Sequence, residues 1–200
     1  MADLRRRFER WRKLLPPNTR FLVDQVLDRI VPECEGRGFR FYPDYAGGDP
    51  HEVAINTIPL QRREGKDWPT IEIHFGPRAR PWFSVYFATL PPLCHRLDGQ
   101  AVARDRATVI YAPAYFVLCK GKRKSLDGQF GYHWCVLTPQ RYLRAEVDEA
   151  TTLLPVVFEL FDPRVPESWL TADFGYVAKH VMLIGSWRIN EQRRAAHRVV

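Results

Sequence analysis

Residues 68–90, WPTIEIHFGPRARPWFSVYFATL, decide the fold. Apolar and polar residues alternate over 71–75 and again over 82–89, which is the pattern of strands with one apolar and one polar face. Gly76 and Pro77 mark a turn between them, because glycine permits positive φ and proline cannot donate to a strand ladder. We therefore expect a β-hairpin here, with the rest of the chain covering the sheet that it starts.

The flanking sequence predicts helices and further strands around this hairpin. Helical periodicity is expected over 3–15, from a cap at Asn18 or Thr19 to Gly36–Gly38, over 138–161 and over 188–200. Strands are expected at 39–42, 53–60, 107–119 and 130–137, the last two as a second hairpin, with a short helix around 93–97. The pattern leaves 176–184 open between strand and helix, and its β-branched residues favour a strand. This order predicts an α+β fold: a mainly antiparallel sheet of about five to seven strands with helices packed on one face.

Positive charge is concentrated at the two ends of the chain. The formal net charge is +7, yet residues 1–13 hold six Lys or Arg against two acidic residues, and residues 188–200 hold four Arg against one Glu. The remaining 14–187 is therefore neutral. We expect a basic amphipathic N-terminal helix over 1–17, one α+β domain over 18–187 and a basic helix or tail over 188–200, and basic ends attract nucleic acid or acidic proteins.

The sequence also indicates a compartment. It has no apolar signal segment at its start and no run of about 18 apolar residues, so neither a secretory signal nor a membrane span is expected. Its four cysteines, Cys34, Cys94, Cys119 and Cys135, form no CxxC pair. We expect a cytoplasmic protein with reduced thiols that pack as small apolar side chains.

One set of residues suggests metal-dependent hydrolysis. Asp44 follows Pro43 after an expected strand, and Glu72 and His74 point the same way because side chains two apart share a strand face. Two carboxylates that converge on Mg²⁺ activate water for phosphodiester attack. The set resembles the Pro-Asp…Asp/Glu-x-Lys pattern of the restriction-endonuclease-like superfamily, with His74 where the pattern has lysine. The resemblance implies a nuclease that uses Asp44, Glu72, His74 and Mg²⁺; the other interpretation is a turn aspartate and a solvated strand face.

A zinc site built from Cys119, His133 and Cys135 matches no known ligand spacing, so we expect these cysteines in the core and no bound metal. Likewise, no GxSxG motif and no phosphate-binding glycine loop occurs.

Binding is the leading hypothesis. The tips of the two expected hairpins carry cations. If both tips lie on the same edge, these cations meet beside Trp82 and Trp68, and basic residues next to aromatic ones suit phosphates and bases. The expected binding residues are Arg78, Arg80, Trp82, Lys120, Lys122, Arg123 and Lys124. By analogy of class, the chain is similar to small bacterial accessory, immunity or defence proteins. We expect a non-enzymatic protein without cofactor, whose partner is a protein or a nucleic acid. A third hypothesis is self-association through the apolar stripe of the N-terminal helix.

Overall fold

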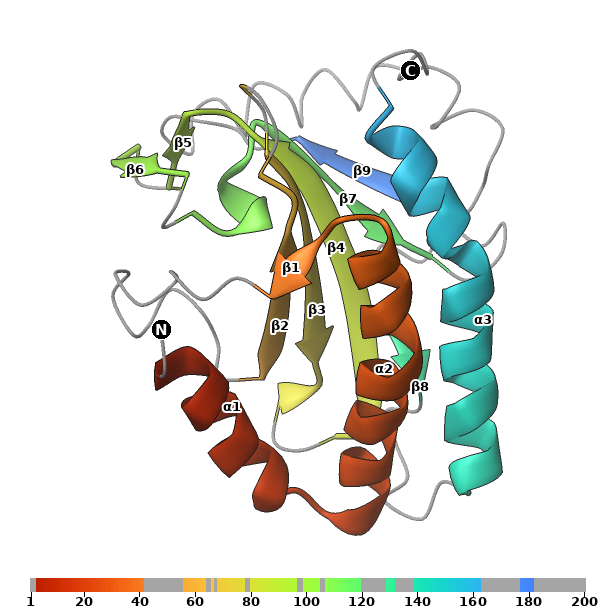
Figure 1. Ribbon diagram of the computed structural model, residues 1–200. Coiled ribbons are helices and arrows are strands. Elements are labelled where there is room, and N and C mark those ends of the chain that lie inside the picture. Colours follow the sequence, from red (N-terminus) through yellow and green to blue (C-terminus); the bar gives the residue numbers. More distant parts are fainter. Residues whose placement is uncertain are drawn as a thin grey trace, which may run out of the picture.

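A computed structural model describes residues 3–41, 56–63, 66, 68–77, 80–96, 99–104, 107–119, 129–131, 139–162 and 177–181. A mainly antiparallel sheet forms one layer and three helices form the other, so the predicted α+β class is confirmed (Figure 1). Among the helices in these ranges, none is long and apolar enough to cross a membrane.

The sheet has the strand order β1-β2-β3-β4-β7-β9, and β8 adds to β4. Every pairing in it is antiparallel. Its strands are β1 (Arg40–Phe41), β2 (Thr57–Gln61), β3 (Trp68–Phe75), β4 (Trp82–Leu90), β7 (Ala114–Leu118), β8 (Gln129–Gly131) and β9 (Val177–Val181). A separate two-stranded sheet pairs β5 (Leu93–His95) with β6 (Ala101–Ala103). The strand interpretation of 176–184 is thus confirmed at β9.

The central hairpin forms as predicted. β3 and β4 pair along their whole length, from Trp68 opposite Leu90 to Phe75 opposite Phe83. The turn closes when the backbone N–H of Gly76 donates to the carbonyl of Trp82 at 2.8 Å. The register places Ile71, Ile73 and Phe75 on the face that the helices cover, and Trp68, Thr70, Glu72 and His74 on the second face.

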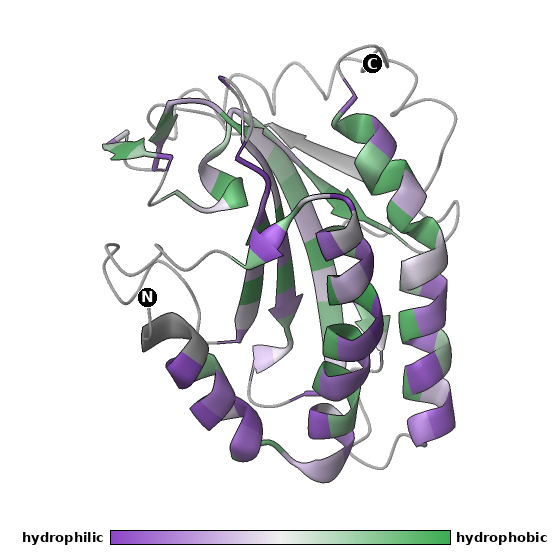
Figure 2. Cartoon of the chain, in the orientation of Figure 1, coloured by the Kyte–Doolittle hydropathy of each residue, from purple (hydrophilic) through white to green (hydrophobic). Residues whose placement is uncertain are grey.

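The helical layer consists of α1 (Asp3–Lys13), α2 (Pro17–Gly36) and α3 (Gln140–Leu160). Each turns an apolar stripe toward the sheet and hydrophilic residues outward, as Figure 2 shows. The main core lies between the layers, and its largest fully buried side chains include Phe8, Phe39, Phe83 and Phe130. Both long helices continue through an internal proline, Pro32 in α2 and Pro155 in α3.

Several local predictions were wrong. Residues 93–95 form a strand instead of a short helix, and Val109–Tyr111 form a 3-10 turn (η3) instead of a strand. The turn is fixed by the side chain of Thr108, which accepts a hydrogen bond from the backbone N–H of Ile110. The cap of α2 is Pro16 rather than Asn18 or Thr19, because the helix already begins at Pro17. Proline is well suited to this first position, since a backbone N–H there would have no partner within the helix.

The expected second hairpin is also corrected. β7 pairs with β4 and β9, whereas β8 pairs with β4 at Trp82–Ser84, so β7 and β8 do not pair with each other. Instead, β8 extends the ladder along β4 beyond the end of β7. The buried carboxyl group of Glu146 in α3 secures β8, because it accepts a 2.7 Å hydrogen bond from the backbone N–H of Gly131. The predictions for 42–55, 132–138 and 188–200 lie outside the described residues.

Candidate functional site

The second face of the sheet carries a row of buried polar side chains. Thr57, His74 and Ser84 are opposite one another on β2, β3 and β4, and Glu72 and Tyr86 lie in the next row. Gln61 and Thr70 follow, joined by a 3.0 Å hydrogen bond. Beyond them the face becomes apolar, where Ala88 and Leu90 pack under η3, β5 and β6. The face is therefore covered at one end and polar at the other.

Glu72 and His74 lie in contact on this face, as their spacing predicts. Glu72 Oε2 is 2.8 Å from His74 Nε2, and Glu72 Oε1 accepts a 3.0 Å hydrogen bond from the backbone N–H of Val109. The Glu72 side chain is 1% exposed and that of His74 is 29% exposed. The interpretation of a solvated strand face is therefore wrong for Glu72, because η3 and the sheet enclose its carboxyl group.

This arrangement orients an imidazole. Glu72 holds the Nε2 side of the His74 ring, and a histidine that a carboxyl group orients in this way can act as a general base. The ring centroid of Tyr86 is 4.7 Å away, and Tyr115 lies next to Tyr86 at 6.2 Å. Burial raises the pKa of Tyr115, so its hydroxyl group keeps its proton at neutral pH.

The described residues around Glu72 do not form a site for a divalent metal ion. Both carboxyl oxygens of Glu72 already have hydrogen-bond partners, and Asp44 lies outside the described residues. Within the described ranges, no three His, Cys, Asp or Glu side chains gather as a metal site requires. His133 and Cys135 of the zinc hypothesis also lie outside these ranges, while Cys119 is buried.

The predicted binding residues are described in part. Arg80 is exposed at the tip of the β3–β4 hairpin, and the half-buried indole of Trp82 packs beside Gly76 at the base of that tip. Trp68, in contrast, lies at the opposite end of the hairpin. The other predicted tip cations lie outside the described residues: Arg78, Lys120, Lys122, Arg123 and Lys124. Gln129, which follows four of them in the sequence, pairs with Ser84 near the tip end of β4.

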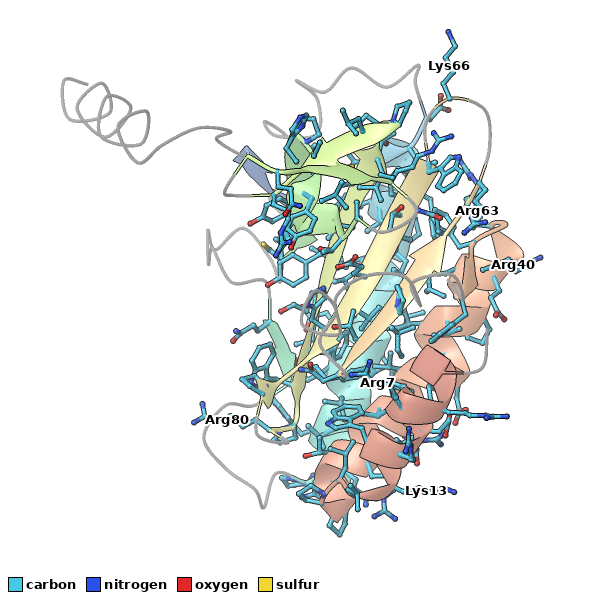
Figure 3. The ribbon with its side chains drawn as sticks, turned by 90° about the vertical axis from the view of Figure 1, so that its left-hand side faces the viewer. Arg7, Lys13, Arg40, Arg63, Lys66 and Arg80 are labelled. Carbon is cyan, nitrogen blue, oxygen red and sulfur yellow. The ribbon has the colours of Figure 1, made fainter. Side chains whose placement is uncertain are left out.

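The basic helix α1 lies at this same end. Its apolar stripe docks on the body of its own chain, where Phe8 and Trp11 pack against Phe75, the last residue of β3. This docking buries Phe8 completely and leaves Arg6, Arg10 and Lys13 exposed. Figure 3 shows Lys13 and Arg80 at one end of the molecule and Lys66 and Arg63 at the other. Phe8 and Leu15 of the stripe are therefore covered by their own chain.

A second basic cluster surrounds Trp68, and the sequence analysis missed it. The guanidinium carbons of Arg104 and Arg63 lie 3.8 and 4.9 Å from the centre of the Trp68 ring. Arg62 donates to the backbone carbonyl of Arg37, and its guanidinium lies over Phe39. These residues come from four separate segments, so no local charge run announces the cluster. The signal that the sequence does hold is the charged segment 62–67 with Trp68 directly after it.

Two of the described cysteines, Cys34 and Cys94, have buried thiols that resist ionisation. Burial raises the pKa of the Cys34 thiol to about 12, and nearby Glu33 and Glu35 add to the effect. Burial likewise raises the pKa of the Cys94 thiol to about 11. Both groups stay protonated at neutral pH, whereas a nucleophilic cysteine needs a lowered pKa.

In comparisons with known proteins, no family model, no curated protein and no solved structure matches the chain.

Proposed function

We propose that this chain is a non-enzymatic binding protein, of the accessory or immunity type, that engages an anionic macromolecular partner through the basic end of the molecule. The observation that carries the proposal is the contact of α1 with Phe75. It holds the exposed cations Arg6, Arg10 and Lys13 at the end where Arg80 projects from the hairpin tip.

The charges on α1 support this proposal because, among the side chains that the structure describes, Arg12 is the one cation of α1 that has a carboxylate partner. Arg12 is bound to Asp24 at 2.7 Å and to Glu9 at 3.3 Å. Within the described residues, Arg6, Arg10 and Lys13 form no ion pair. Holding like charges together on one rigid helix is unfavourable for the isolated protein, and an anionic partner relieves that repulsion.

A second structural detail supports a rigid presentation of this surface. The guanidinium of Arg20 donates 3.0 Å hydrogen bonds to the carbonyls of Lys13 and Leu15, just past the C-terminus of α1. An arginine that satisfies the last carbonyls of a helix stabilises its end. Arg6, Arg10 and Lys13 are thus held on an ordered helix, so less conformational entropy is lost when a partner binds.

The test compares two charge-matched double variants. Arg10→Gln/Lys13→Gln removes two charges from α1, and Arg29→Gln/Arg144→Gln removes two from the outer surface of α2 and α3 as a control. Probes are a 20-bp DNA duplex, a single-stranded RNA and poly-L-glutamate, followed by fluorescence anisotropy. We expect the α1 variant to lose about tenfold in affinity for at least one probe relative to the control. Binding of no probe, or equal binding by both variants, would overturn the proposal.

The hairpin tips are tested separately by changing Arg78, Arg80, Arg123 and Lys124 to Glu. We expect this variant to lose binding to the same probe as the α1 variant, since Arg80 and α1 flank Phe75. Binding at the wild-type level would remove the tips from the proposal and leave α1.

A metal-dependent nuclease is the second candidate; the contact with Glu72 favours it only by orienting His74 as a general base, because it leaves no oxygen of Glu72 without a partner. It predicts cleavage of DNA or RNA that requires Mg²⁺ or Mn²⁺ and that His74→Ala abolishes. His74 is the better target than Glu72, whose carboxyl group also supports η3. Absence of cleavage across both substrates would dismiss this candidate.

A further inference from the structure

We infer that the arginine cluster around Trp68 is a second binding site, and that it takes the backbone phosphates of a nucleic acid. The cluster is defined here as Arg37, Arg40, Arg62, Arg63, Lys66 and Arg104. It uses neither α1 nor Arg80, and it lies at the opposite end of the β3–β4 hairpin, so the inference goes beyond the proposed function.

Direct contacts link most of the cluster into one surface. Arg63 and Arg104 both lie over Trp68, and Arg104 also donates to the backbone carbonyl of Lys66. Arg62 joins the carboxyl-terminal end of α2 through the carbonyl of Arg37, at 3.5 Å. The edge strand β1 adds Arg40, which is opposite Gln61 in the register. Six cations from distant parts of the chain therefore converge at one end of the sheet.

Neutral groups hold several of these guanidiniums in place. Arg40 donates to the backbone carbonyls of Glu35 and Phe39 at 2.7 and 2.8 Å. Arg37 lies over the ring of Phe158, with 5.2 Å between the guanidinium carbon and the ring centroid. An aromatic face or a carbonyl oxygen orients a guanidinium without cancelling its charge. The fold thus positions Arg37 and Arg40 through contacts that do not cancel their charge.

The charge balance of the cluster favours an anion. The same sequence segments also hold Glu33, Glu35, Glu64, Asp67 and Asp105, and one further cation, Arg106. When all of these are counted, seven positive charges stand against five negative ones, which leaves a surplus of two. Arginine forks match phosphate oxygens in pairs, which makes phosphate the anion that this residue choice fits best.

The layout favours an extended ligand over a small one. Arg37, Arg40, Arg63 and Lys66 are exposed on the surface instead of lining an enclosed cavity. Trp68 packs against the second core cluster and already has two guanidiniums over its ring, so it is not free to stack on a base. We therefore assign contacts to the phosphate backbone, without base recognition.

The two basic surfaces suit one long polyanion. Seven residue steps along β3 separate Trp68 from Phe75, a length of roughly 23 Å at the usual rise per residue. Successive phosphates of one DNA strand are about 3.4 Å apart along the axis, so this separation corresponds to about seven base pairs. Figure 3 shows Lys66 at one of these ends and Lys13 and Arg80 at the other.

The experiment measures binding of a 20-bp DNA duplex by the full chain, in two unrelated sequences. We expect Arg63→Gln/Arg104→Gln to lose about tenfold in affinity for both sequences relative to the control Arg29→Gln/Arg144→Gln. Thermal unfolding of each variant checks the fold. Equal binding by the two double variants, or a loss confined to one DNA sequence, would overturn the inference.

A lysine pair keeps the test decisive if loss of the stacked guanidiniums perturbs the fold. Arg63→Lys/Arg104→Lys retains the charge and should lose less affinity than the glutamine pair; an equal loss would show that charge is not what binds. The outcomes also separate the two proposals. If DNA does not bind but poly-L-glutamate binds through α1, this inference fails and the proposed function stands. If Arg63→Gln/Arg104→Gln loses affinity for DNA and the α1 variant does not, the proposed function fails and this inference stands.

Discussion

Trp11 of α1 and Phe75 of β3 pack with their ring centroids 5.8 Å apart, and this contact fixes the basic helix beside the hairpin tip. Phe8 adds a second ring 6.3 Å from Phe75. The position of the α1 cations therefore depends on hydrophobic packing within one chain, which gives mutations in that packing a predictable effect on both stability and binding.

Phe8→Ala should destabilise the protein, because a fully buried aromatic ring would leave a cavity between α1 and Phe75. We expect a loss of about 3–5 kcal/mol in the free energy of unfolding, measured by urea denaturation. Leu14, which is 85% exposed, provides the control, and Leu14→Ala should change stability by less than about 0.5 kcal/mol. Similar stabilities for the two variants would show that α1 is not docked as described.

Glu72→Ala should also be strongly destabilising, although the side chain is polar. It would leave the buried N–H of Val109 without its acceptor and remove the partner of His74, at a cost of about 2–4 kcal/mol. Glu72→Gln keeps one acceptor and should cost less. The exposed Glu149 of α3 is the matched control, and a Glu72→Ala variant as stable as Glu149→Ala would contradict the buried position of Glu72.

Gly131→Ala should weaken the attachment of β8 to β4. Gly131 has φ of 106°, and an added Cβ would lie 2.4 Å from the carbonyl oxygen of Pro81, which is backbone and cannot easily move. We expect a lower midpoint of thermal unfolding. Gly36→Ala is the control, because nothing lies within 4 Å of its Cβ and alanine favours a helix, so its midpoint should be equal or higher. A Gly131→Ala protein at the wild-type midpoint would refute the strain.

The buried thiol of Cys34 predicts a pH effect. In the folded chain its pKa is about 12, against an ordinary value of 9.0, so above about pH 9 the unfolded chain releases this proton and the folded chain keeps it. The free energy of unfolding should therefore fall as pH rises from about 9 toward 12. Cys34→Ala lacks this contribution and should decline less steeply between about pH 8 and 10.5 in urea denaturation. Parallel declines would argue against a buried, protonated thiol.

Sequence periodicity predicted the parts of the fold that depend on local patterns. The alternation over 68–90 was sufficient for the hairpin and for the shared face of Glu72 and His74. It could not reveal that η3 buries Glu72, because that contact joins residues 37 positions apart. The pairing of β8 with β4 was missed for a related reason: a strand adjacent in sequence to β7 was assumed to be its partner.

The candidate binding surfaces show the same limit. A run of arginines in residues 3–13 is visible in the sequence, and its amphipathic spacing predicted the helix that carries it. The cluster at Trp68 is assembled from α2, β1, the segment after β2 and the segment after β6, so its charges meet only in three dimensions. Single-sequence reading has no access to such convergence.

The salt dependence of DNA binding tests the central claim most directly. The logarithm of the association constant falls with the logarithm of salt concentration, with a slope of about −0.9 for each phosphate contact. For a 20-bp duplex we predict that Arg10→Gln/Lys13→Gln makes this slope shallower by about 2, while Arg29→Gln/Arg144→Gln leaves it unchanged. A slope that is the same in the wild type and in the α1 variant would contradict an anionic partner held by this basic end.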